Sequence, residues 1–387
     1  MPEPTIYFIR EEFAERQARV RAALAERGLD GMLLFKIEDM YWLCGLDTQG
    51  FVIFHAMYIG VNGELTHITR SADVPSIEYS SVCDDVHLWV DSLENSPFNS
   101  VREVLERYKL KGKRVGVQHD TYGLTSKMGR DLAVAVGDYC ELVDASDMIR
   151  LMRVVKSPQE LEYIREAGKI IDKAMAKGLE LTRAGAYEGD ILAEMHGLIW
   201  KSGGDPPASH WPVGSGKKAV LVRYATGRGT VGENDQVTYE IAAAYRHYHA
   251  ANMVAALTGP RVDDRHRRMH EACLAALEAV QGALRPGNTV GDVFLAHADA
   301  FTRHGYGHAF LNACGYTMGA TWAPSWMEHP MIVGDNPLVL RPSMTFFTHM
   351  ILVDRESGLT MSLGEQSIIL ENGVEVITHV PHELVVN

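Results

Sequence analysis

The chain has 387 residues, of which 46% are apolar and 22% are charged, and its formal net charge is −13. This length is more than one simple core usually holds, so a soluble globular protein with two domains is expected. The acidic balance argues against nucleic acid as a partner, because phosphate binding needs a basic face. No apolar run reaches the roughly 18–20 residues of a membrane-spanning helix, which argues against a membrane protein.

The N-terminal stretch MPEPTIYFIREEFAERQARV is charged and lacks the apolar segment of a secretory signal, so a cytoplasmic location is expected. The five cysteines are scattered along the chain and form no CxxC pair. This pattern argues against a disulfide framework and against a cysteine zinc site.

The first part of the chain alternates helical and strand-like patterns. Residues 11–28 place apolar side chains at helical spacing, and GLDGMLLF (28–35) is typical of a turn into a buried strand. The segments that follow are strand-like over 50–61, 114–120 and 140–146 and helical near 126–135. This alternation predicts an α/β domain over residues 1–152.

A second domain is expected over residues 153–387. Ser157, Pro158 and Glu160 have the spacing of a capping box, which predicts a long helix over about 158–181. Further helices are predicted over 188–201, 263–283 and 290–304, and strands over 237–243, 253–257, 344–353 and 366–370. Helices grouped before and between antiparallel-looking strands predict an α+β domain.

The stretch YEIAAAYRHYHAANM (239–253) holds three groups that can carry chemistry, namely Glu240, His247 and His249. In an extended strand the two histidines would share a face and could meet one ion. A zinc site needs more ligands, and the two alanines that follow supply none. Such a pair is more often the polar face of a strand, while each imidazole remains a candidate acid or base because it titrates near neutrality.

A second histidine pair lies in RHGYGHAF (303–310), where His304 and His308 flank two glycines. The pattern is similar to metal-binding loops. His304 also fits the last turn of a helix, where the helix dipole favours it and Gly305 would act as the cap. The capping interpretation is the stronger one.

The segment GYTMGATWAPSW (315–326) leads into aromatic residues and prolines. Trp322 and Trp326 either wall a small cationic ligand or belong to the core. Residues 203–230 are too rich in glycine and proline for regular structure, and long ordered loops in compact enzymes are usually functional. The chemically interesting members of this loop are His210, Trp211 and Arg223.

Five segments in this order resemble the creatinase/prolidase/aminopeptidase family, which has the pita-bread fold. They are ERQARVRAALAERGLDGMLL, VVKSPQELEYIREA, RPGNTVGDVF, VLRPSMTFFTHMILV and SIILENGVEVITHVP. The resemblance runs nearly end to end. It implies a small N-terminal α/β domain followed by a pseudo-symmetric α+β pita-bread catalytic domain, and it implies a homodimer.

Metallopeptidases of this family hold two divalent ions with two Asp, one His and two Glu. The first Asp position is Glu240 here, and the second, eleven residues later, is Ala251. The family histidine falls on His308 or on Tyr316, and the spacing to the RPSM turn favours Tyr316. The next Glu position is His349, and the last lies at or within one residue of Glu365. The resemblance therefore implies no dinuclear metal centre and no cofactor.

Metal-free members of the family, the creatinases and ectoine hydrolases, cleave non-peptide C–N bonds of small cationic compounds. The resemblance thus implies a metal-independent hydrolase of a small zwitterionic amidine or guanidino substrate. Glu240 would be the key carboxylate, which either pairs with the substrate cation or attacks the electrophilic carbon, and Glu365 would be the second carboxylate. His249 or His349 would move the proton. Arg223 stands at or near a position where these relatives have a histidine, and it would anchor the substrate carboxylate. The expected substrate site also includes His210, His247, Tyr316 and Trp322.

Two other functions remain open from the sequence. One is a metal-dependent Xaa-Pro peptidase or lyase of the same fold. The other is a binding protein that kept the cavity and lost catalysis.

Overall fold

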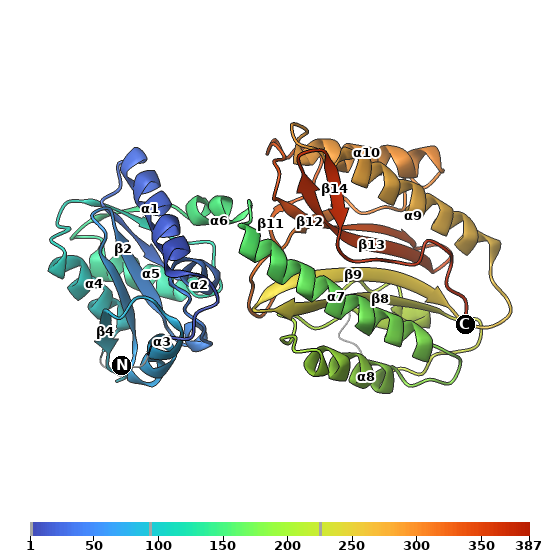
Figure 1. Cartoon of the computed structure of the whole chain (residues 1–387), viewed down its shortest axis with the longest axis horizontal. Helices are drawn as coiled ribbons and strands as arrows, with labels where there is room; N and C mark the ends of the chain where they lie inside the picture. Colours follow the sequence, from blue (N-terminus) through green and yellow to red (C-terminus); the bar gives the residue numbers. More distant parts are fainter. Residues whose placement is uncertain (1–2, 93–94, 224–226) are drawn as a thin grey trace. The chain divides into compact units, whose positions relative to one another are not determined.

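The computed structural model describes residues 3–92, 95–223 and 227–387, and the chain divides into two compact units, Met1–Arg153 and Val154–Asn387 (Figure 1). The division lies one residue after the boundary expected from the sequence. Among the helices of the described residues, none is long and apolar enough to cross a membrane.

The N-terminal unit is a mixed sheet with helices packed on it. Its strand order over the described residues is β4-β3-β2-β1-β5-β6. The strands are β1 (Gly31–Leu34), β2 (Ala56–Gly60), β3 (Leu65–Arg70), β4 (Val86–Trp89), β5 (Arg114–Val117) and β6 (Glu141–Asp144). The helices are α1 (Arg10–Glu26), α2 (Ile37–Cys44), α3 (Val74–Ser80), α4 (Pro97–Arg107), α5 (Ser126–Val136) and α6 (Asp147–Arg153).

Local sequence explains how the helices of this unit begin and what they bury. Helix α4 starts with Pro97 after the N-cap Ser96, whose hydroxyl accepts from the Phe98 N–H, and Thr125 caps α5 in the same way. Both helices bury apolar side chains in one core with β1, β2 and β5. The α/β organisation expected for this half is therefore confirmed.

The C-terminal unit is built on one antiparallel sheet. Its strand order over the described residues is β11-β10-β12-β13-β9-β8-β7, and β14 pairs with β13. The strands are β7 (Val213–Ser215), β8 (Gln236–Tyr245), β9 (Tyr248–Leu257), β10 (Gly315–Thr317), β11 (Glu328–Met331), β12 (Thr345–Asp354), β13 (Leu359–Leu370) and β14 (Gly373–Val376). The helices are α7 (Pro158–Leu181), α8 (Glu188–Lys201), α9 (Asp264–Ala283) and α10 (Val290–Arg303).

Two similar halves make up this unit. Helix α7 packs on β8 and β9 and is accompanied by α8, whereas α9 packs on β12 and β13 and is accompanied by α10 (Figure 1). The capping box predicted for α7 is present, because Ser157 accepts from the Glu160 N–H at 3.2 Å and Glu160 accepts from the Ser157 N–H at 2.7 Å. The α+β prediction for this half is confirmed.

The two faces of the sheet differ in what covers them. On one face, here called the helical face, Asn252 donates to Asp172 of α7 at 3.0 Å. The other face, here called the inner face, carries a row of directly paired residues. Glu240 pairs with Met253, Met253 with Gly364, and Gly364 with His349. Residues that pair directly share a face of the sheet, so the two halves meet at this row.

Candidate active site

The strands β8 and β9 are joined by a two-residue turn, Arg246–His247. Both residues have positive φ, 54° and 65°, as a type I′ hairpin turn requires. The prediction that His247 and His249 share a strand face is therefore wrong, because His247 belongs to the turn. Its ring stacks on Trp322 with centroids 4.1 Å apart, and the place of both residues in a substrate site stays a prediction.

His249 is fully buried, and other groups occupy both of its ring nitrogens. Nε2 accepts a hydrogen bond from the Ala208 N–H at 3.0 Å, so the proton of the neutral ring lies on Nδ1. Nδ1 lies 2.8 Å from the His247 carbonyl oxygen and 3.0 Å from the Thr321 hydroxyl. Burial lowers the pKa of His249 to about 4. This imidazole fastens surrounding segments together, so its predicted role in proton transfer is not supported.

Glu240 is a buried carboxylate on the inner face, at the end of a hydrogen-bond chain. Trp326 Nε1–H donates to the Tyr316 hydroxyl at 2.8 Å, and the Tyr316 hydroxyl donates to Glu240 Oε1 at 3.2 Å. The Tyr316 oxygen is already occupied as an acceptor, so its proton is directed at the carboxylate. Tyr316 therefore donates to Glu240, and its predicted contact with substrate stays a prediction.

The electrostatic surroundings of Glu240 favour a carboxyl group that titrates near neutrality. Burial raises the pKa of Glu240 to about 7, and the positive charge of Arg223 and the Tyr316 hydrogen bond oppose part of this rise. Groups with a pKa near the working pH are the ones that exchange protons efficiently.

His349 lies in the same row of the inner face as Glu240. Its ring centroid is 5.7 Å from that of Tyr316. Among the described residues, its buried Nδ1 has no hydrogen-bond partner. Burial lowers the pKa of His349 to about 4, which keeps the ring neutral at pH 7. A neutral imidazole with an unoccupied nitrogen can accept a proton or a hydrogen bond from a ligand.

Glu365 does not belong to this site. It pairs with Thr348, one residue out of step with the Gly364–His349 pair, so its side chain lies on the helical face. There it accepts from Gln281 Nε2 at 2.6 Å and from the Val380 N–H at 3.0 Å. The prediction of Glu365 as a second catalytic carboxylate is therefore corrected.

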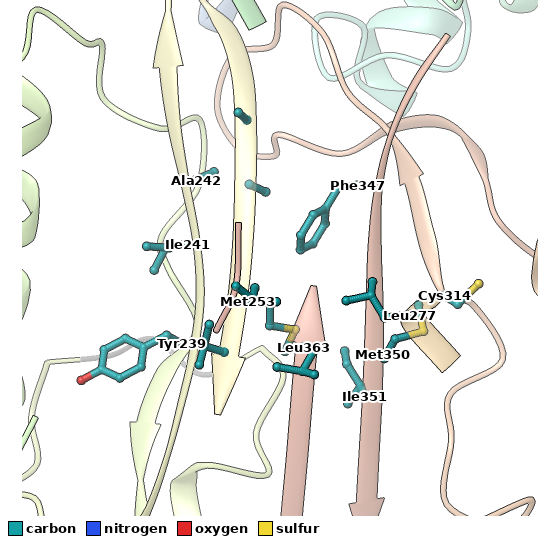
Figure 2. Packing of buried hydrophobic residues seen from close by; sticks show 14 of the residues in the cluster. Tyr239, Ile241, Ala242, Met253, Leu277, Cys314, Phe347, Met350, Ile351 and Leu363 are labelled. Atoms are coloured by element: carbon teal, nitrogen blue, oxygen red, sulfur yellow. The ribbon is translucent and has the colours of Figure 1, made fainter. Parts of the chain in front are cut away.

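The inner-face position beside His349 is Gly364, and an aromatic ring fills the space above it. A Cβ atom added at Gly364 would lie 2.9 Å from both Phe347 Cζ and Met253 Cβ. Figure 2 shows the Phe347 ring directed toward the strand that carries Met253. The sequence analysis missed Phe347 and Gly364. Phe347 could have been found, because it precedes His349 by two residues and so lies on the same face of the strand.

These positions do not fit the two metal ions of the family's peptidases. Glu240 keeps a carboxylate, but the resemblance assigns the other ligand positions to Ala251, Tyr316 and His349 and to a position at or within one residue of Glu365. On the inner face that last position is Gly364, which pairs with His349. No group of three or more His, Cys, Asp or Glu side chains that could hold a metal is found within residues 3–92, 95–223 and 227–387. Divalent ions bound through oxygen need several anionic ligands, and one carboxylate does not supply them.

A pocket of about 180 Å³ lies beside this row. It is lined by Ser209, His210, Pro212, Arg223, Ser325, Trp326 and Met327. The Pro212 carbonyl oxygen accepts from the Glu240 N–H at 3.1 Å, and Trp326 is linked to the Glu240 carboxylate through the Tyr316 hydroxyl. The pocket therefore lies next to Glu240, which is not itself part of the lining. Arg223 and His210 are exposed and line this pocket, and their place in a substrate site stays a prediction.

The remaining histidine and tryptophan candidates, His304, His308 and Trp211, lie outside the inner-face row that contains Glu240. His304 is the C-cap of α10, with Nδ1 2.9 Å from the Ala300 carbonyl oxygen. His308 lines a different hollow with Phe310 and Asp354. Trp211 donates to the Ala242 carbonyl oxygen at 2.9 Å and is buried. The capping interpretation of His304 agrees with this geometry.

Comparisons with known proteins agree with the fold and with the resemblance seen in five segments. Residues 162–378 match the model of metallopeptidase family M24, and residues 16–155 match the creatinase/prolidase N-terminal domain. An ectoine hydrolase from Halomonas elongata is 27% identical over 100% of both chains. A probable dipeptidase PepE from Mycobacterium tuberculosis is 26% identical over 98% of both chains.

A solved structure gives the same fold. The dipeptidase PepE from Mycobacterium ulcerans superposes with a TM-score of 0.85 at 24% identity and covers 98% of this chain and 99% of its own. The resemblance inferred from the sequence is therefore confirmed, and the chain belongs to metallopeptidase family M24, with a creatinase/prolidase N-terminal domain.

Proposed function

We propose that this hydrolase of family M24 cleaves a non-peptide C–N bond of a small zwitterionic amidine or guanidino compound without a metal ion. One observation carries the proposal: a single buried carboxylate, Glu240, lies in a row whose other family metal-ligand positions are not acidic. The ectoine hydrolase relative, 27% identical over its full length, supports an ectoine-like substrate.

A planar organic cation suits this arrangement. In its ionised form Glu240 can accept two parallel N–H groups of an amidinium or guanidinium. Burial disfavours the charged carboxylate on its own, so a cationic substrate gains affinity by supplying the missing counter-charge.

Proton transfer would involve two groups on the inner face. Addition of water to the electrophilic carbon releases a proton, and breaking the C–N bond requires a proton on the leaving nitrogen. Glu240, whose pKa is about 7, can accept the first and deliver the second. The unpartnered Nδ1 of His349 provides a second position where a proton can be held.

The pocket favours a small substrate with an anionic end. Its volume of about 180 Å³ is below the roughly 300–1,000 Å³ that is typical of sites for drug-sized ligands. Arg223 and His210 line it together. The guanidinium of Arg223 can bind a carboxylate bidentately, at the end opposite the group that binds Glu240.

The variant Glu240→Gln tests this proposal with a panel of cyclic amidines and guanidino acids. Glutamine keeps the shape but loses the charge and the proton-transfer group, so kcat/KM should fall by about a hundredfold or more. Glu365→Gln, which changes a buried carboxylate on the helical face, serves as the matched control and should keep turnover. Wild-type turnover in Glu240→Gln would contradict the assignment.

A metal-dependent peptidase is the second candidate. The probable dipeptidase PepE is 26% identical to this chain, which is close to the 27% identity of the ectoine hydrolase. Elemental analysis of the purified protein, with Xaa-Pro dipeptides as substrates, separates the two functions. About one or two divalent ions per chain, with activity that a chelator abolishes, would favour the peptidase. Ligands from the amidine panel that bind and are recovered unchanged would instead indicate a binding protein.

A further inference from the structure

The loop that carries Arg223 is fastened at both of its ends. Its outgoing end is strand β7, which pairs with β8, Val213 opposite Tyr239 and Ser215 opposite Val237. Its returning end pairs with the segment just before α8, where the Glu188 N–H donates to the Gly229 carbonyl oxygen at 2.8 Å. The two ends therefore meet at the first residue of α8, which is Glu188.

One carboxylate holds both ends of this loop. Glu188 is fully buried, and its Oε1 accepts from the Ser215 N–H at 2.9 Å and from the Ser215 hydroxyl at 2.7 Å. Its Oε2 accepts from the Arg228 N–H at 3.1 Å and from the Gly229 N–H at 2.7 Å. Lys218 reaches both oxygens, at 2.9 and 3.0 Å. These contacts are here called the Glu188 clasp.

The clasp is paired in charge and closely packed. Burial acts to raise the pKa of Glu188, but hydrogen bonds from Ser215 and Lys218 outweigh it and hold the pKa below its usual value. A Cβ atom at Gly229 would collide with Lys218 Nζ and would lie 2.6 Å from Glu188 Oε1. The returning end therefore reaches the carboxylate only because residue 229 has no side chain.

The Arg223 side chain makes only a weak contact with the described residues around it. Its side chain is exposed, and its Nη1 lies 3.6 Å from the Met327 sulfur, a weak acceptor. Yet its positive charge acts on Glu240, Tyr316 and His349. The described backbone that leads from β7 to Arg223 therefore helps to place this charge.

We infer that Glu188 is a positioning residue that sets the place of Arg223 at the pocket and thereby the affinity for the anionic end of the substrate. This inference rests on the proposed function for the anchoring role of Arg223. Glu188 itself lies in the clasp and not in the pocket lining, so its effect on the reaction passes through the loop.

The variant Glu188→Gln keeps the shape of the side chain and removes its charge. We expect KM for a carboxylate-bearing amidine to rise about tenfold, which corresponds to about 1.4 kcal/mol, while kcat changes by less than about twofold. KM for the same amidine without its carboxylate should not change. In an Arg223→Ala background, Glu188→Gln should raise KM little further, because both substitutions weaken the same interaction between Arg223 and the substrate carboxylate. Equal rises in KM for both amidines would contradict the inference.

A second variant and a control protect the test against simple misfolding. In Gly229→Ala the added methyl group meets the ends of two flexible side chains, so it should open the clasp, leave the fold intact and raise KM in the same selective way. Glu365→Gln removes a buried charge on the helical face and should leave KM for both amidines unchanged. Wild-type KM values in a folded Gly229→Ala protein would overturn the inference.

Limited trypsin digestion separates failure of this inference from failure of the proposed function. The loop contains Lys217, Lys218, Arg223 and Arg228 as cleavage sites. Glu188→Gln and Gly229→Ala should be cut there at least about fivefold faster than the wild type and Glu365→Gln, because opening the clasp exposes more backbone. Faster cleavage of the two variants, with no amidine turnover by the wild type, would support the Glu188 clasp and reject only the proposed substrate. Unchanged cleavage would reject the clasp.

Discussion

At the scale of single residues, the chemistry of the site depends on how Glu240 is surrounded. Its carboxylate is buried, and within the part of the chain that the structure describes, a hydrogen bond from Tyr316 and the charge of Arg223 favour the ionised form. Burial outweighs both, so the pKa lies near 7 rather than near that of an exposed glutamate. Removing either the Tyr316 hydrogen bond or the Arg223 charge should therefore raise the pKa of Glu240 by a measurable amount.

Tyr316→Phe is expected to move the acid side of the pH–rate profile upward. The Tyr316 hydroxyl stabilises charged Glu240, so its loss raises the pKa of the carboxyl group further above about 7. If ionised Glu240 binds the substrate cation, kcat/KM falls below this pKa, and the midpoint should shift up by about half to one pH unit. The control is Tyr239→Phe, which loses the hydrogen bond to Thr182 on the helical face. A downward shift for Tyr316→Phe would contradict this account.

At the scale of elements, strand register and turn type decide which residues meet. Glu365 and Gly364 differ by one position, yet one lies on the helical face and the other on the inner face. His247 and His249 differ by two positions, yet the turn at Arg246–His247 separates them. The two histidines predicted for proton transfer also differ in their surroundings, because both ring nitrogens of His249 have partners and Nδ1 of His349 has none among the described residues.

Separate substitutions of these two histidines should give opposite results. His249→Ala leaves the Ala208 N–H without its acceptor, so the free energy of unfolding should fall by about 1–3 kcal/mol while kcat stays within a few-fold. His349→Ala removes a ring whose Nδ1 has no partner among the described residues, and kcat should fall by about a hundredfold. Denaturant unfolding and initial rates measure the two effects. Loss of kcat in a stable His249→Ala protein would show that the roles were assigned wrongly.

The sequence was sufficient for features that local patterns determine. The capping box at Ser157 predicts the start of α7 at Pro158, and the spacing of motifs predicts Glu240 and Ala251 at their positions on β8 and β9. The sequence was not sufficient to predict which face of the sheet each side chain occupies. A shift of one residue at Glu365 moves the side chain from one face of the sheet to the other. It also missed the clasp, because Glu188 is distant in sequence from Ser215 and Gly229 and meets them only through tertiary packing.

At the scale of the whole molecule, each unit has its own core, and chemistry and stability depend on different buried groups. In the C-terminal unit the inner-face row takes Glu240 and Met253 from one half and Gly364 and His349 from the other. In the N-terminal unit two fully buried histidines contact each other, with His55 Nε2 3.1 Å from His67 Nδ1. That pair has no place in the proposed reaction.

The buried histidine pair should make the N-terminal unit sensitive to acid. Burial lowers the pKa of His55 to about 3 and that of His67 well below its usual value. Above pH 6.5, the usual value, neither the folded nor the unfolded state holds these protons, and the full stability is present. As the pH falls below 6.5 toward about 3, the unfolded state takes up protons that the folded state refuses, so the free energy of unfolding decreases.

The expected slope is up to about 1.4 kcal/mol per pH unit for each histidine. Replacing His55 by Leu removes one of these protons from the balance. The change also takes away the His55 Nε2 partner of His67 Nδ1, so the free energy of unfolding should be lower at every pH, and the slope with pH is the quantity to compare. Unfolding of the full chain by denaturant between about pH 6.5 and 4.5, followed by a probe in the N-terminal unit, should therefore show a shallower pH dependence for His55→Leu than for the wild type. His119→Gln, at an exposed histidine of the same unit, should keep the wild-type slope. Equal slopes for all three proteins would mean that the His55–His67 pair does not control the acid limit of this fold.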